Sequence, residues 1–484
     1  MLGDSMVGRF FDRLLHIPPT PYLFVVPFLV GTGRAILENL LFRNACTDLE
    51  TVLYYSTSYL LLQMFLLIVF RVASGRDYRE LLGPSTVGLV FGLLPPLIDA
   101  AIGVPPGQQE LYFRGFEWDF AAPYQALGET ITLWLGVAAA AVFCAWLTRS
   151  VWRTVLGTVL CYAALQILGG PSWAVSYHLG KLCHLSPPAI LNMLIFLVAL
   201  GTYSVFHPAT MGPSLARVNH ALPWGLAALL GARMAGQPWS LALVKSLAMV
   251  LAFQLVVIAN DWFDRDADGA AGGTARPATH DDAVFSMLLQ VLLLAWVATA
   301  LPHSFAAVLL FFGVGLAYQL PALRFKRLFC LGYKLEGAAG AAAFLFGVGD
   351  MKGLPGDSSW VPWIALLAFG GFAFGCMFKD YKDIDQDRQA RIGTIYTRYL
   401  ARQFTLRAIH RFVVTGLAIG LLVPAVWLAL RGEPLWRSVV LAVLGVAPAV
   451  PLLRCADKRV AVERAFWCLD AYLLFLVFVV PTFG

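Results

Sequence analysis

The sequence predicts an all-α, polytopic integral membrane protein. Hydrophobic residues make up 59% of the 484 residues and charged residues only 13%, and the mean hydropathy is +0.72. Apolar runs of about 18 to 22 residues, long enough to cross the hydrocarbon core of a bilayer as helices, recur along the chain. Runs of this length argue against a membrane β-barrel, whose strands are short and alternate in polarity.

The apolar runs predict about fifteen membrane-spanning helices in two groups. The first group, of six, is expected near residues 21–42, 52–71, 85–103, 128–147, 151–169 and 187–206. The second group, of nine, is expected near 218–233, 239–260, 281–300, 304–320, 333–349, 361–379, 407–430, 437–453 and 462–481. A stretch with proline and glycine, His207 to Ser214, separates an N-terminal membrane module, 1–206, from a second domain, 207–484.

Basic residues predict the orientation of these helices. Most loops on one side of the topology carry Lys or Arg, whereas the opposite loops, 104–127, 170–186 and 350–360, are poor in both. The basic side is therefore expected to face the cytoplasm, with the chain in a bacterial inner membrane or its equivalent. This bias accounts for the formal charge of +6, so we expect membrane lipid as a partner and no nucleic acid. The eight cysteines show no metal-ligand spacing.

Two acidic clusters stand out against the scarcity of charge. NDWFDRDAD covers residues 260–268 and KDYKDIDQD covers residues 379–387, and each directly follows a predicted span on the cytoplasmic side. Ordinary solvated loops also favour Asp, but they do not need oxygen-bearing side chains at repeated helical spacing.

The spacing of these side chains predicts a magnesium site. Asn260, Asp264 and Asp268 recur every fourth residue, which places them on one face of a helix that continues past the membrane surface. Asp383 and Asp387 repeat the spacing, with Asp380 one turn earlier. Two such faces opposed across a cavity would hold Mg²⁺ between carboxylates and the oxygens of a diphosphate.

The two clusters resemble the motifs of the UbiA superfamily of membrane prenyltransferases. NDWFDRDAD, followed by TARP at residues 274–277, is similar to the first motif of the family, and KDYKDIDQD is similar to the second. Between them, AYQLPALRFKR at residues 317–327 is similar to the tyrosine and basic segment of the family. The resemblance covers residues 215–484 and implies a nine-helix bundle with a central cavity, preceded here by about six further transmembrane helices.

The resemblance implies a role for each matched residue. Asn260, Asp264, Asp268, Asp383 and Asp387 match the magnesium ligands. The catalytic positions are Tyr318 near the allylic carbon, Lys326 as a phosphate-binding lysine, and Asp261 in support; the diphosphate-binding positions are Arg276, Arg324, Lys326, Arg327 and Lys379. Lys326 follows Tyr318 at a longer distance than in the tightest family version, so Arg324 is expected to share or replace its role. Tyr318 and the three basic residues Arg324, Lys326 and Arg327 also fit simpler explanations, since Tyr favours the membrane interface and basic residues favour cytoplasmic loops.

The predicted function is Mg²⁺-dependent transfer of a prenyl group from an isoprenyl diphosphate to an acceptor that the sequence does not identify. An allylic diphosphate ionises more readily when cations neutralise the leaving group and an aromatic face stabilises the carbocation. Within the family the alternatives are terpene cyclisation and phosphoribosyl or polyprenyl-phosphate transfer. A non-catalytic transporter or lipid-binding protein is the alternative from a different class.

Overall fold

The computed structural model describes most of the chain, and every regular element in that part is helical. The described residues are 6–42, 49–103, 127–207, 211, 217–270, 279–320, 325, 328, 330–350, 360–389 and 392–480, with the backbone alone at a few helical positions such as 168–174 and 265–270. They divide into two compact units, residues 1–208 and 209–484. The prediction of an all-α fold is confirmed.

Helices of the first unit follow the predicted spans with two differences. They are α1 Met6–Leu15, α2 Val26–Phe42, α3 Leu49–Ser74, α4 Tyr78–Gly88, α5 Leu94–Ile102, α6 Leu127–Thr148, α7 Val151–Cys183 and α8 Pro187–Phe206, with the 3₁₀ turns η1 Pro21–Val25 and η2 Leu89–Leu93. The predicted span over 85–103 lies almost entirely within one candidate membrane-crossing segment, Tyr78–Ile102, in which η2 separates α4 from α5. The prediction of a loop over 170–186 is wrong over most of its length.

The end of α7 shows why hydropathy misplaced that loop. The second half of this helix, LGGPSWAVSYHLGKLC at residues 168–183, contains glycine, proline and polar residues, so a hydropathy profile stops early. The helix ends instead where His184 adopts a left-handed backbone with φ of 56° and its N–H bonds to the carbonyl oxygen of Gly180. Capping geometry, rather than polarity, therefore sets this boundary.

Helices of the second unit also match the predicted spans. They are α10 Val218–Met234, α11 Trp239–Ala270, α12 His280–Ala300, α13 Phe305–Gln319, α14 Leu331–Val348, α15 Trp360–Gly375, α16 Ile384–Gln389, α17 Ile395–Leu400, α18 Leu406–Leu430, α19 Leu435–Val446, α20 Ala449–Arg454 and α21 Lys458–Val479, with the 3₁₀ turns η4 Pro302–Ser304 and η6 Phe378–Tyr381. Across both units, the described residues include 11 helical segments long and apolar enough to cross a membrane. The protein is thus a multi-pass integral membrane protein.

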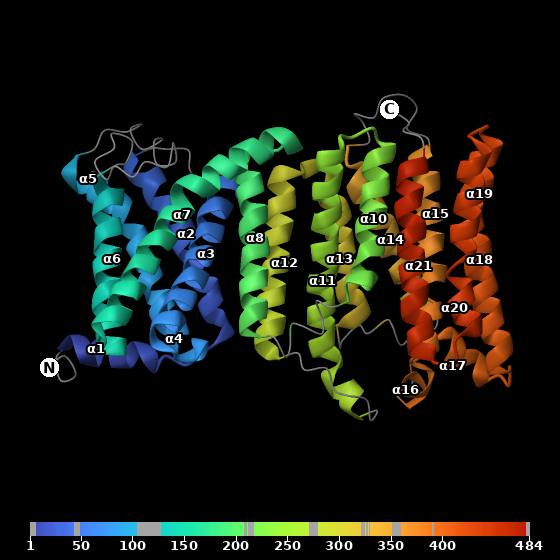
Figure 1. Cartoon of the computed structure of the whole chain (residues 1–484), viewed down its shortest axis with the longest axis horizontal. Coiled ribbons are helices and arrows are strands. Elements are labelled where there is room, and N and C mark those ends of the chain that lie inside the picture. The colour runs from blue at the N-terminus through green and yellow to red at the C-terminus, as the bar shows by residue number, and fades with distance from the viewer. Residues whose placement is uncertain are drawn as a thin grey trace. The chain divides into compact units, whose positions relative to one another are not determined.

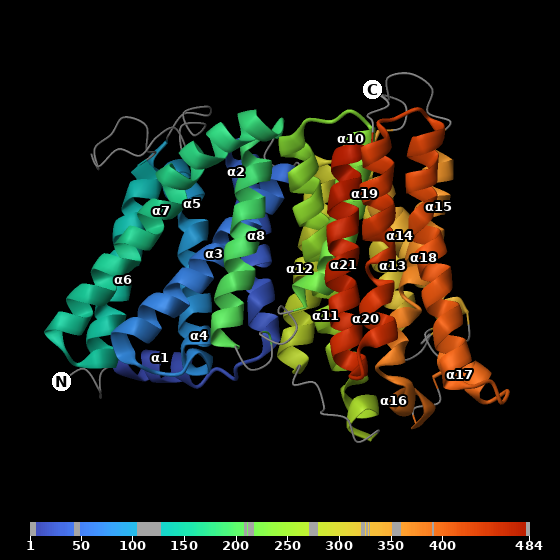
Figure 2. The same ribbon diagram turned by 45° about the vertical axis from the view of Figure 1, so that its right-hand side comes forward.

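Small residues bring α10, α14 and α15 close together in the second unit. A side chain at Gly347 would clash with the carbonyl oxygen of Ala228 on α10, and one at Gly231 would clash with that of Phe344 on α14. A side chain at Gly340 would likewise clash with the ring of Phe372 on α15. In lipid, where apolar side chains gain little by associating, close backbone approach of this kind supplies the packing energy. Both views show these helices running alongside one another (Figures 1 and 2).

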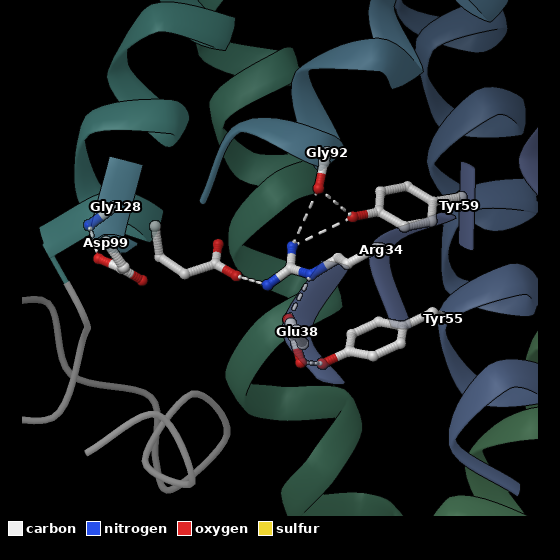
Figure 3. A network of polar contacts seen from close by, with 8 residues as sticks. Arg34, Glu38, Tyr55, Tyr59, Gly92, Asp99 and Gly128 are labelled. Atoms are coloured by element: carbon white, nitrogen blue, oxygen red, sulfur yellow. Dashed lines mark hydrogen bonds and ion pairs between the residues drawn. The ribbon is translucent and has the colours of Figure 1, made fainter. Parts of the chain in front are cut away.

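A buried polar network joins the helices of the first unit (Figure 3). Arg34 on α2 donates from Nε to Glu38 Oε1 at 2.8 Å and from Nη1 to the Tyr59 hydroxyl at 3.1 Å. Its Nη2 pairs with Glu129 on α6. Tyr55 donates to the other oxygen of Glu38 at 2.7 Å. The network accounts for an arginine and a glutamate that are 5% and 2% exposed inside an apolar helix.

Replacing Arg34 by methionine should destabilise the first unit by about 3 to 5 kcal/mol, because the Glu38 carboxylate would stay buried without its cation. Hydrogen exchange of α2 and α3 in detergent measures this change. Arg76→Met is the matched control: its partner Glu80 is also one turn away, but both side chains are more than 40% exposed, so the expected cost is below about 1 kcal/mol. Equal effects of the two substitutions would contradict a stabilising role for the network.

Candidate functional site

The second unit encloses a cavity of about 730 Å³. Its walls come from α10, α11, α13, α14, α15, α18 and α21, together with the segment from Lys379 to Thr394. Aromatic side chains cluster in its apolar part, where Trp224 stacks on Phe253 with ring centroids 5.4 Å apart and packs against Phe372 at 4.5 Å. The cavity is therefore shaped for a ligand with a large apolar portion.

The first acidic cluster borders this cavity from the end of α11. The helix runs without a break to Ala270, so the predicted continuation beyond the apolar span is confirmed. Asn260 and Asp264, one helical turn apart, both line the cavity. The amide oxygen of Asn260 is buried and has no hydrogen-bond donor among the described residues. An oxygen in this state is suited to accept a ligand.

The second acidic cluster reaches the same cavity, but not on one continuous helix as its spacing suggested. The 3₁₀ turn η6 ends at Tyr381 and α16 begins at Ile384. Asp383 lies at the break and Asp387 within α16, and both line the cavity. The amide of Asp387 still donates to the carbonyl oxygen of Asp383 at 2.8 Å, so one helical turn separates the two side chains across the break.

Both clusters lie at one end of the bundle, because the end of α11 and α16 project beyond the same face in both views (Figures 1 and 2). No three His, Cys, Asp or Glu side chains in the described ranges are placed to hold a metal ion by themselves. The oxygen-only donor set of Asn260, Asp264, Asp383 and Asp387 nevertheless fits Mg²⁺. This ion keeps water and phosphate oxygens in its coordination shell and seldom uses a cage made of protein ligands alone.

A bidentate ion pair positions the first cluster. Arg217, just before α10, donates to both carboxylate oxygens of Asp261 at 3.1 and 2.9 Å. The Asp261 side chain is 2% exposed and is not part of the cavity wall, whereas its neighbour Asn260 is. The pair therefore ties the start of the bundle to the helical turn that carries Asn260 and Asp264.

A second group of charged and aromatic residues borders the cavity near the end of α15. Lys379 forms an ion pair with Glu336 on α14, and its Nζ lies 5.5 Å from the centre of the Tyr318 ring on α13. Beside them, the Tyr333 hydroxyl donates to Asp380 at 2.6 Å and accepts the amide N–H of Ile395 at 2.8 Å. These bonds attach the segment that carries Asp383 and Asp387 to α14.

Buried polar contacts also hold α17 in place beneath the cavity end. Thr394 caps this helix and lines the cavity. His410 Nε2 lies 2.8 Å from the carbonyl oxygen of Leu452, so this nitrogen donates and Nδ1 accepts from the Tyr396 hydroxyl at 3.0 Å. Burial raises the pKa of Tyr396 far above its usual range, which keeps that hydroxyl a donor.

Several predicted site residues lie outside the part of the chain that the structure describes. They are Arg276, Arg324, Lys326 and Arg327, and for Asp268 only the backbone is described, in the last turns of α11. The structure adds three polar residues that the motifs did not single out as site residues, Arg217, Glu336 and Tyr333, which all line the cavity. Arg217 and Glu336 could have been found in the sequence, because each is a charged residue beside an apolar span. Tyr333 carried no signal in the sequence.

Asp470 lies elsewhere than its sequence position suggested. A last helix over residues 462–481, as predicted above, would place Asp470 near its cytoplasmic start, at the membrane interface. In the structure it stands in the middle of α21 and is 6% exposed, and neither carboxylate oxygen has a hydrogen-bond partner among the described residues. The helix begins at Lys458, about one turn earlier than predicted, which moves Asp470 deeper into the bundle.

The fold and the cavity define a polytopic helical membrane protein with an oxygen-rich ligand site at one end of an apolar chamber. The model of the UbiA prenyltransferase family matches residues 221–476, which is more than half of the chain. The chain belongs to this family of membrane prenyltransferases, as the two acidic motifs predicted.

Comparison with solved structures finds two proteins with limited overall similarity. A digeranylgeranylglyceryl phosphate synthase is 16% identical, with a TM-score of 0.38, over 55% of this chain and 96% of that protein. A UbiA homologue from Archaeoglobus fulgidus bound to DMAPP and Mg²⁺ is also 16% identical, with a TM-score of 0.40, over 56% of this chain and 99% of that protein. A search of curated proteins finds no significant match.

Arg217→Gln should destabilise the second unit by on the order of 3 kcal/mol, because it removes both hydrogen bonds to a buried carboxylate. The double variant Arg217→Gln with Asp261→Asn should recover most of this loss, because no charge is then left buried. Thermal unfolding in detergent measures both variants. If the double variant is as unstable as the sum of the single variants, the pair does not act as a unit.

Proposed function

We propose that the protein transfers a prenyl group from an isoprenyl diphosphate to an acceptor, with Mg²⁺ as the cofactor. The carrying observation is that two oxygen-bearing pairs from separate parts of the chain, Asn260 with Asp264 and Asp383 with Asp387, border one cavity that also has a large apolar part lined by aromatic side chains. The polar end suits a diphosphate and the aromatic end suits an isoprenoid chain. Membership of the UbiA prenyltransferase family supports the reaction class.

Four oxygen-bearing side chains would hold the metal. Asn260 and Asp264 supply donors from one side and Asp383 and Asp387 from the other, with Asp268 one turn further along the first motif. When bound, Mg²⁺ would neutralise negative charge on the diphosphate and favour its departure. Arg217 would act on this set indirectly, because its bidentate bond to Asp261 orients the turn that carries Asn260 and Asp264.

Other residues would favour cleavage of the allylic carbon–oxygen bond. The ammonium group of Lys379 borders the cavity and would balance charge on the leaving diphosphate. The adjacent Tyr318 ring would stabilise positive charge on the allylic carbon. From the sequence we assign further diphosphate contacts to Arg276, Arg324, Lys326 and Arg327. The apolar walls around Trp224 would exclude water from the reactive carbon.

Catalysis is assigned to the second unit. Every described residue that lines the cavity lies between Arg217 and Val480, and the family match falls inside the same range. The N-terminal module, residues 1–206, is assigned to packing, localisation or partner binding.

Asp264→Ala and Asp387→Ala should each reduce Mg²⁺-dependent release of pyrophosphate from geranylgeranyl diphosphate by more than about 100-fold, since even groups outside the inner coordination shell are worth about 10- to 100-fold. The purified full-length protein in detergent is assayed, and its unfolding midpoint should stay near the wild-type value. Asp385→Asn is the matched control from the second cluster, because its side chain is 84% exposed. Activity that survives both alanine variants with Mg²⁺ still required would refute the two-cluster site.

The proposed orientation places both acidic clusters in the cytoplasm, because basic loops favour that side. Single cysteines introduced at Ala270 and Gln389, in a cysteine-free background, should both be protected from a membrane-impermeant thiol reagent added to intact cells. Both should react after the cells are opened. Labelling of one cysteine alone from outside would place the clusters on opposite sides and exclude a shared metal site.

A further inference from the structure

Glu336 is a cavity carboxylate that belongs to neither acidic cluster. It stands on α14 and lines the cavity together with Tyr318 and Lys379. Its side chain is only 11% exposed. Metal binding as proposed above uses Asn260 and the aspartates and leaves Glu336 without a role.

The two carboxylate oxygens of Glu336 differ in their contacts. Oε1 pairs with the ammonium group of Lys379. Oε2 is buried and has no hydrogen-bond donor among the described residues. A buried, charged acceptor without a donor is unfavourable, so native structures normally supply a partner from the protein, from water or from a ligand. An oxygen left open beside a cavity is therefore a place for a ligand's donor group.

The surroundings of Glu336 place it beside the proposed site of bond cleavage. The Tyr318 hydroxyl and the Cys376 thiol lie beside it, and the thiol is a further hydrogen-bond partner of the Glu336 carboxylate, whose Oε2 nevertheless has no donor among the described residues. The backbone that carries it is held firmly, because the following residue, Gly337, packs directly against the carbonyl oxygen of Phe369 on α15. Glu336 thus stands on a helix whose separation from α15 allows little adjustment, and Lys379 follows α15 in the turn η6.

We propose that Glu336 binds the hydroxyl group of the acceptor through Oε2 and takes its proton during transfer. The inference rests on the proposed function. In this step the allylic carbon–oxygen bond breaks and diphosphate leaves with the electron pair. A bond forms from the acceptor to the allylic carbon, and the acceptor's proton passes to Oε2. Protonation of Glu336 leaves the Lys379 charge to balance the departing diphosphate.

The chemistry of a carboxylate identifies the acceptor class. A charged carboxylate only accepts hydrogen bonds, so the atom that faces it must be a donor. A hydroxyl group meets this condition and becomes a nucleophile when its proton is taken. We therefore assign an alcohol or a phenol as the acceptor. Cyclisation, in which no acceptor takes part, gives Glu336 no partner.

The test uses purified full-length protein with geranylgeranyl diphosphate and Mg²⁺. Total membrane lipid from the expression host serves as the pool of acceptors. Pyrophosphate release is measured without lipid, and prenylated products are identified by mass spectrometry with lipid present. The wild-type protein should yield either a prenyl ether of an alcohol or a prenylated phenol, and these two products distinguish the two acceptor sources.

Glu336→Gln should lower the ratio of prenylated product to released pyrophosphate by about 100-fold, the lower range of what a positioned proton acceptor contributes. Glu336→Asp, which keeps a carboxylate, should recover part of the ratio. Lys334→Gln, an exposed position on the same helix outside the cavity wall, should leave the ratio at the wild-type value. A purely structural role through Lys379 would instead lower product and pyrophosphate together and leave the ratio unchanged.

Three results would overturn the proposal. They are an unchanged ratio in Glu336→Gln, a wild-type product joined to a compound without a hydroxyl group, and a wild-type reaction that yields only a cyclised product or the free prenyl alcohol. Absence of pyrophosphate release from the wild-type protein is a different failure, because it refutes the proposed function itself.

Discussion

A charged side chain inside an apolar helical bundle needs a partner, and this requirement governs where charge stands in both units. In the first unit Arg34 pairs with Glu38 and donates to the Tyr59 hydroxyl, while Tyr55 donates to Glu38. In the second, buried Lys245 donates to the carbonyl oxygen of Gly347 at 2.9 Å, at the carboxyl end of α14. There the ammonium group satisfies a backbone acceptor that the helix leaves open.

Within the described residues, some buried side-chain oxygens at the cavity are not satisfied in this way, and Asp470 is a further exception that lies outside the cavity wall. Asn260 and Glu336 each keep a buried oxygen without a donor among the described residues, and both border the same cavity. Their neighbours Asp261 and Asp380 are held by Arg217 and Tyr333. The site therefore combines fixed carboxylates, which orient the chain, with open oxygens, which are free to meet metal, diphosphate or acceptor.

Helix packing determines the shape of the chamber between these groups. Glycines at the contacts of α14 with α10 and α15 bring backbones together, so the helices approach too closely there for side chains to separate them. Bulky residues such as Trp224 and Phe372 then project into the remaining space.

The sequence by itself determined the class of protein, the places of its helices and its family. Hydropathy and run length depend only on nearby residues, so the membrane spans could be predicted from the sequence. The motifs around Asp264 and Asp387 indicated the family that the family model confirms. Boundaries set by capping, such as the end of α7 at His184, were not readable from hydropathy.

Tertiary structure alone decided which polar groups meet. Arg217 and Asp261 are 44 residues apart and Tyr333 and Asp380 are 47 apart, and no local pattern relates the members of either pair. The tertiary structure also divides the second acidic cluster between two helical elements, η6 and α16. The physical reason is that spacing along a helix fixes which side chains share a face, whereas the packing of one helix on another fixes what that face meets.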